Sequence, residues 1–231
     1  MHIGWIDIGP GTVISLVFLF LLIRSIIRLG RTYMSRHDPR YRIELSYRVF
    51  AVVFTLACFA LPAYLEFRIQ FANAYASSMT RKVVGNNEVH ARCQRGLADM
   101  LEIKSISYAG WVEGKPGTKR SNLTSQICGH LISWVLSDKQ HASRDQLIAL
   151  HVVIHEAVHL TGEYSEAETE YKTTEYFEGV VVSMGASQSE AKRMNDYYKS
   201  EVNPHMPEAY RVDFAAREQR KADAQKQAEG N

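Results

Sequence analysis

The sequence lacks an excess of charge of either sign. Its 231 residues include 27 lysines and arginines against 25 aspartates and glutamates, which gives a formal net charge of +2. A balance this even gives no indication of nucleic-acid binding, which depends on a strongly basic surface. Internal repeats and glycine-rich phosphate loops are also missing from the sequence. We therefore expect no nucleic-acid partner.

Positive charge is missing from the N-terminus, because residues 1–11 contain no lysine or arginine. A secretory signal peptide carries positive charge before its apolar run and a small-residue cleavage site after it. The sequence has neither feature. The N-terminal apolar run is therefore not expected to be a signal peptide.

Cysteine is scarce, with three residues in the whole chain. Cys58 lies within an apolar run, which leaves Cys93 and Cys128 as one pair. In an oxidising compartment this pair would favour a disulfide, whereas in the cytoplasm both residues would be free thiols.

Two long apolar runs occupy the first 70 residues. One extends from Gly9 to Ile23 and continues to Ile27, and the other extends from Val49 to Leu65. Apolar runs of this length are typical of transmembrane helices, although two buried helices of a soluble protein are the alternative. We expect residues 1–70 to form a transmembrane hairpin, with the lipid bilayer as a partner.

Arginine is concentrated between the two runs and at their edges. Cytoplasmic loops of membrane proteins carry an excess of lysine and arginine, so the connecting loop is predicted to be cytoplasmic. Both termini, and the region from about Arg68 onwards, would then lie outside the cytoplasm. The arginines are Arg24, Arg28, Arg31, Arg36, Arg40, Arg42 and Arg48, opposed by Asp38 and Glu44.

Residues 71–231 are sufficient for one domain with a hydrophobic core. The pattern predicts a helix over 87–102 that contains Cys93, a strand over 106–113, and helices over 125–136 and 187–202. From Pro207 onward alanine and charged residues dominate, which indicates a solvated helix or a frayed tail. We expect a mainly α protein with a small β element, divided into domain 71–206 and tail 207–231.

The most informative motif is His155-Glu156-Ala157-Val158-His159. Two imidazoles four residues apart lie on one face of a helix and can hold zinc, while Glu156 can accept a proton from a water that the metal activates. The motif lies in a predicted buried helix, residues 145–161, where unpaired polar side chains are costly. A metal would supply their partner, and satisfied core histidines are the alternative.

A second helix is predicted directly after the motif. Gly162 suits the residue that ends a helix, and Ser165 with Glu168 forms a capping box for the next one. On that helix Glu166 and Glu170 point towards the core, where acidic residues are seldom found without a partner. Both are candidates for a third ligand, and counting residues back from the short turn places Glu170 level with the histidines.

This arrangement resembles the zincin metallopeptidases, and within them the gluzincin branch, in which H-E-x-x-H is followed by a helix carrying E-x-x-x-D. The resemblance covers about residues 147–177, with glutamate at the final position. It implies that His155, His159 and Glu166 hold zinc, that Glu156 is the general base, and that Glu170 accepts a hydrogen bond from a ligand histidine. Small membrane-attached bacterial H-E-x-x-H proteins are also similar.

The sequence therefore predicts a membrane-anchored zinc metallopeptidase whose substrate is a peptide or protein. Its active site would lie outside the cytoplasm. One alternative is a non-catalytic membrane protein that binds a partner or has a structural metal site, in which His151 joins His155, His159 and Glu166. Another retains the chemistry but acts on a different amide, such as cell-wall peptide.

Overall fold

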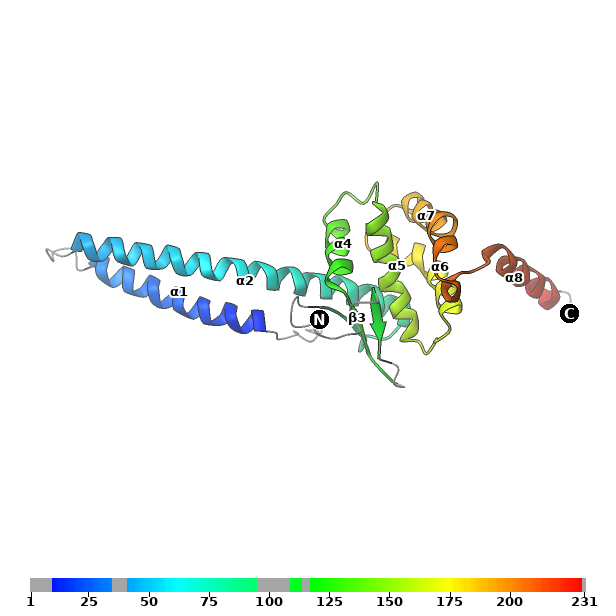
Figure 1. Cartoon of the computed structure of the whole chain (residues 1–231), viewed down its shortest axis with the longest axis horizontal. Coiled ribbons are helices and arrows are strands. Elements are labelled where there is room, and N and C mark those ends of the chain that lie inside the picture. The colour runs from blue at the N-terminus through cyan, green and yellow to red at the C-terminus, as the bar shows by residue number, and fades with distance from the viewer. Residues whose placement is uncertain (1–9, 35–40, 95–108, 114–116, 230–231) are drawn as a thin grey trace. The chain divides into compact units, whose positions relative to one another are not determined.

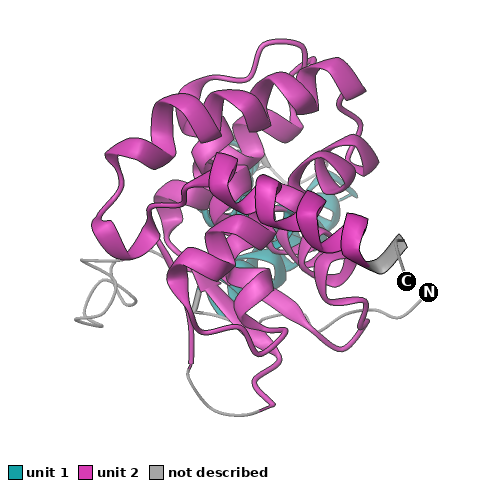
Figure 2. Cartoon of the chain, turned by 90° about the vertical axis from the view of Figure 1, so that its right-hand side faces the viewer, with its two compact units in different colours: residues 1–71 teal, residues 72–231 magenta. Residues whose placement is uncertain are grey.

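The computed structural model describes residues 10–34, 41–94, 109–113 and 117–229. The chain divides into two compact units, Met1–Phe71 and Ala72–Asn231, which are coloured separately in Figure 2. Helices dominate both units, and the second also contains a small three-stranded sheet. The prediction of a mainly α fold with a small β element is confirmed.

The first unit contains α1, Pro10–Met34, and the greater part of α2, Tyr41–Val84. The two helices form an antiparallel pair (Figure 1), and α2 continues through Pro62. Almost none of the residues in their most apolar stretches are buried, and large side chains such as Phe20 and Phe50 face outward. Core helices of a soluble protein would bury these side chains. Both helices are long and apolar enough to cross a membrane.

The last turns of α2 belong to the second unit, where Ala76 and Met79 are fully buried. There Ser77 binds strand β1, His90–Cys93, because its hydroxyl donates to the Ala91 carbonyl and accepts from the Ala91 amide. Asn73 adds a third bond by accepting from the Cys93 amide at 2.7 Å. These bonds hold one edge of the sheet against α2.

The sheet has the strand order β1-β3-β2, where β2 is Gly110–Val112 and β3 is Arg120–Leu123. Strand β1 runs parallel to β3, whereas β2 runs antiparallel to it and pairs Trp111 with Asn122. Among the described residues β2 therefore forms the edge opposite β1. Strand β2 lies within the predicted strand 106–113, of which 106–108 fall outside the described residues.

The predicted helix over 87–102 is wrong at its start, because His90–Cys93 is a strand and residues 95–102 lie outside the described part of the chain. Pairing with β3 and the two bonds from Ser77 satisfy the backbone of this segment outside any helix. Tertiary partners of this kind override a weak local periodicity.

The remaining helices of the second unit form the core around α5, Arg144–His159, which packs against α4, Ser125–Val135, and α6, Glu166–Ser183. Helix α7, Gln188–Tyr197, packs against α6 and continues as a π-helix over Tyr198–Val202. Short 3₁₀ turns at Asn203–His205 and Glu208–Tyr210 precede α8, Phe214–Glu229. The sheet lies against α5 through β2 and β3.

Cys93 and Cys128 form the disulfide that the sequence allowed, with their Cα atoms 6.0 Å apart. The bond joins the end of β1 to α4. Cys58, in α2, is a free thiol. A disulfide is the state expected of this pair in an oxidising compartment.

Candidate metal centre

Helix α5 places three histidines on successive turns, His151, His155 and His159. Its start is fixed by a capping box in which Ser143 and Gln146 exchange side-chain to backbone bonds. The helix ends at His159, and Gly162 then adopts a φ of +93°, a conformation that glycine reaches without strain. The Ser165 hydroxyl accepts from the Glu168 amide and starts α6, which brings the glutamates of α6 opposite the histidines.

Three side chains converge at the C-terminal end of α5 and form what we call the outer group, His155, His159 and Glu166. The two Nε2 atoms of the histidines lie 3.0 Å apart. Glu166 Oε2 lies 3.1 Å from His155 Nε2 and 3.4 Å from His159 Nε2. All three donor atoms therefore face one common point.

Whether each Nε2 atom has a free lone pair depends on whether the ring proton is on Nδ1. His159 Nδ1 lies 2.7 Å from the Glu163 carbonyl, which can only accept a hydrogen bond, so the ring proton is on Nδ1. His155 Nδ1 lies 3.1 Å from Glu170 Oε1, which favours a proton on that nitrogen too. The lone pairs of both Nε2 atoms then face each other and a carboxylate oxygen. Three electron-rich atoms this close repel one another unless a positive charge lies among them, either a shared proton or a metal ion.

The spacing of the donors fits a small divalent metal. Ligands at about 2.0–2.1 Å from a tetrahedral ion are about 3.3 Å apart, close to the three distances observed. The carbonyl and carboxylate that hold the Nδ1 atoms are the partners that commonly orient metal-binding histidines. The outer group therefore has the donors, spacing and supporting contacts of a metal site.

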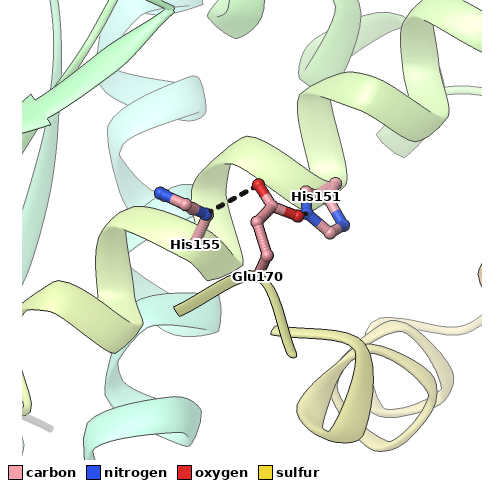
Figure 3. A group of neighbouring side chains, drawn as sticks. All are labelled: His151, His155 and Glu170. Atoms are coloured by element: carbon pink, nitrogen blue, oxygen red, sulfur yellow. Dashed lines mark hydrogen bonds and ion pairs between the residues drawn. The ribbon is translucent and has the colours of Figure 1, made fainter. Parts of the chain in front are cut away.

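A second cluster, the inner group, contains His151, His155 and Glu170 and could also hold a metal. Figure 3 shows the Glu170 carboxylate between the two imidazoles. His151 Nε2 lies 2.8 Å from Oε2, whereas His155 Nδ1 lies 3.1 Å from Oε1. The His151 contact has hydrogen-bond geometry and the His155 contact is a close ion pair, so the two rings meet different oxygens of one carboxylate. His155 belongs to both groups through opposite nitrogens.

Glu156, the expected general base, lies next to the outer group and is 6% exposed. Its Oε2 atom has no hydrogen-bond partner among the described residues. Strand β2 covers it closely, since a Cβ atom on Gly110 would lie 2.7 Å from Glu156 Cγ and 2.9 Å from Oε1. Burial raises the pKa of Glu156 to about 8, and the charge of Glu166 acts in the same direction.

The histidines and glutamates of the site perturb one another strongly. Burial alone would lower the pKa of His155, but the carboxylates of Glu166 and Glu170 outweigh it and raise that pKa to about 9. Burial also disfavours the charge on Glu170, yet His151 and His155 hold its pKa far below the usual range. Burial lowers the pKa of His151, which favours a neutral ring.

Metal binding should therefore depend on pH. His155 has a pKa of about 9, raised from 6.5, so near neutral pH it carries a proton that a metal ion must displace. We expect zinc affinity, measured by competition with a chromophoric chelator, to fall by about tenfold for each unit of pH decrease below about 8.5. An affinity that stays constant from about pH 8.5 to about pH 6.5 would contradict a displaced proton.

A groove of about 290 Å³ opens beside His159. Its described lining has no residue of fixed charge and comes from β2, the segment after it, the last residue of α5 and the turn between α5 and α6. Tyr164 stands at the groove with 59% of its surface exposed. The lining residues are Val112, Gly117, Thr118, His159, Leu160, Thr161, Gly162 and Tyr164.

The structure brings together the predicted residues His155, His159 and Glu166, and Glu156 is buried next to His155 in α5 and interacts electrostatically with His155 and Glu166. Glu170 instead meets the other nitrogen of His155, and His151 lies in the inner group. From the sequence, either glutamate is a candidate for the third ligand, and His151 is a candidate for a fourth ligand beside His159. The structure groups His151 with His155 and Glu170 and not with His159.

Three further residues near the site had no signal in the sequence. Gly110 contacts Glu156 from β2, and Tyr198 donates to Glu170 from the π-helix. The Tyr210 ring lies 6.0 Å from that of His155, held by the bond from Asn203 to the Tyr210 carbonyl. Each lies far along the chain from the motif, where no residue spacing could indicate it.

A comparison with known protein families, curated proteins and solved structures finds no match to this chain. Its function is therefore inferred from the chemistry of the site.

Proposed function

We propose that this protein is a membrane-anchored zinc metallopeptidase whose zinc ligands are His155, His159 and Glu166. The observation that carries the proposal is the convergence of these three donor atoms, 3.0–3.4 Å apart, beside a buried glutamate. Two histidines and a carboxylate form the ligand set of several catalytic zinc sites and leave a fourth position for water or substrate.

Glu156 is the base of the proposed reaction. It accepts a proton from the attacking water and returns it to the amine that leaves as the peptide bond breaks. Zinc, when bound, polarises the substrate carbonyl and lowers the pKa of water. A buried carboxylate with one oxygen unpaired among the described residues is suited to this role, because none of their hydrogen bonds to that oxygen has to be broken before the proton moves.

An extended peptide is the substrate that the surroundings of the site favour. Strand β2 is an edge strand among the described residues, it lies against α5, and Gly110 within it contacts Glu156. A peptide can add to such an edge through backbone hydrogen bonds. The groove beside His159 would then receive an uncharged side chain of the peptide.

The proposed location is a membrane with the second unit outside the cytoplasm. Helices α1 and α2 are long and apolar enough to span, and the arginine-rich segment between their apolar stretches would be cytoplasmic. The disulfide between Cys93 and Cys128 supports an oxidising compartment for the second unit.

The test uses the full-length protein in detergent, incubated with a mixture of unstructured peptides of varied sequence. We expect cleavage that is lost on removal of zinc by a chelator and restored by about one equivalent of zinc per chain. Tight zinc binding with no cleavage of any peptide would overturn the peptidase and leave a structural metal site. A folded protein that binds no zinc would overturn both.

A further inference from the structure

We propose that His151 and Tyr198 are positioning residues that act through Glu170 to fix the orientation and basicity of the zinc ligand His155. This inference rests on the proposed zinc site and extends it by two residues. Neither His151 nor Tyr198 belongs to the outer group, and both are 2% exposed. Both meet the same oxygen of the Glu170 carboxylate.

Glu170 is the centre of the arrangement, since both of its oxygens are engaged. Oε2 accepts from the Tyr198 hydroxyl at 2.8 Å and lies 2.8 Å from His151 Nε2. Oε1 faces His155 Nδ1 at 3.1 Å (Figure 3). Two contacts on Oε2 fix the plane of the carboxylate, and the fixed plane determines where Oε1 meets the ligand histidine.

His151 and Tyr198 also hold each other. Their rings stack with centroids 3.5 Å apart and planes inclined by 14°. His151 Nδ1 is buried without a hydrogen-bond partner among the described residues, so Glu170 is the hydrogen-bond partner that orients this ring. A buried nitrogen without a hydrogen-bond partner lowers the stability of the fold. Since His151 lies one turn before the proposed ligands in α5, this loss of stability indicates that the ring does more than fill space.

Tyr198 reaches Glu170 from an unusual backbone. It begins the π-helix Tyr198–Val202 directly after α7. π-helical turns are rare and occur frequently at functional sites, because the extra residue redirects a side chain. Here the redirected side chain is buried and its hydroxyl is bonded to Glu170.

A carboxylate that accepts a hydrogen bond from the ring nitrogen that does not bind the metal makes the histidine a more basic ligand. Loss of such a carboxylate lowers metal affinity by about 10- to 100-fold. Tyr198→Phe removes one oxygen atom and keeps the ring that stacks on His151. We therefore expect Tyr198→Phe to weaken zinc binding by about tenfold, and His151→Gln to weaken it by about 10- to 100-fold.

The experiment measures zinc affinity of the full-length protein in detergent by chelator competition, for wild type, Tyr198→Phe, Glu170→Gln and the double variant. If Tyr198 acts through Glu170, its replacement changes affinity by less than about twofold in the Glu170→Gln background. Tyr197→Phe, at a half-buried neighbouring tyrosine outside the cluster, is the matched control. Thermal unfolding checks that each variant is folded.

Cobalt(II) in place of zinc provides an absorption spectrum that reports on the metal ligands and would not change if Tyr198 affected only the packing of the core. We expect its visible absorption bands to shift in Tyr198→Phe and to remain unchanged in Tyr197→Phe. Wild-type zinc affinity in Tyr198→Phe, or a full additional loss in the double variant, would overturn the inference and leave the zinc site intact. A folded wild type without zinc affinity would overturn the zinc site and this inference together.

Discussion

Replacement of Glu156 by glutamine is expected to lower peptide hydrolysis by about a thousandfold, within the range that a general base contributes, and to leave zinc binding in place. The amide has the size and shape of the carboxylate but cannot accept a proton from water. Glu156 is buried beside the outer group and supplies none of its three donor atoms, so the ligand set survives the change. Initial rates and zinc content measured on the same preparation check both parts.

Three companion variants distinguish the role of the base from that of its surroundings. Glu190→Gln removes a second glutamate that is also 6% exposed, but in α7, where it pairs with Arg193. Gly110→Ala displaces Glu156, because the added Cβ would lie 2.7 Å from its side chain, whereas Gly129→Ala adds a Cβ in open space. We expect losses of activity in Glu156→Gln and Gly110→Ala only. Full activity in Glu156→Gln would exclude this residue as the base.

Much of this fold follows from local sequence signals. The two apolar runs are longer than a core helix requires, and from Pro10 onward they lie within α1 and α2. Helix α6 has the cap that the sequence predicts, since the Ser165 hydroxyl accepts from the Glu168 amide at its start. Strand β1 could not be predicted in the same way, since its four residues are held by Ser77 of α2 and by β3 rather than by their own propensity.

In the candidate site too, residues placed by local spacing are predictable and residues placed by distant contacts are not. The spacing of His155 and His159 fixes their common face, because one helical turn determines it. The choice between Glu166 and Glu170 could not be made from spacing, since both lie within reach of His155 and differ in which ring nitrogen they meet. Tyr198 was beyond prediction, as its position depends on a π-helix that begins at that residue.

Replacement of His159 by alanine is expected to weaken zinc binding by a factor of about a thousand or more, because one of three protein ligands is lost. His159 distinguishes the two possible metal positions better than His155 does. It contributes Nε2 to the outer group only, while its Nδ1 is bonded to the Glu163 carbonyl. His155 contributes to both groups, so its loss would remove a metal from either.

The matched variant for this comparison is His151→Ala, which removes a histidine of the inner group only. With zinc in the outer group, His151→Ala still binds one zinc per chain, more weakly than wild type because Glu170 loses a partner. His141→Ala, at an exposed histidine before α5, should bind zinc as the wild type does. Zinc that persists in His159→Ala and disappears in His151→Ala would place the ion between His151, His155 and Glu170. Such an ion would be held by three buried side chains. This result would contradict the proposal that zinc in the outer group acts together with Glu156 in catalysis.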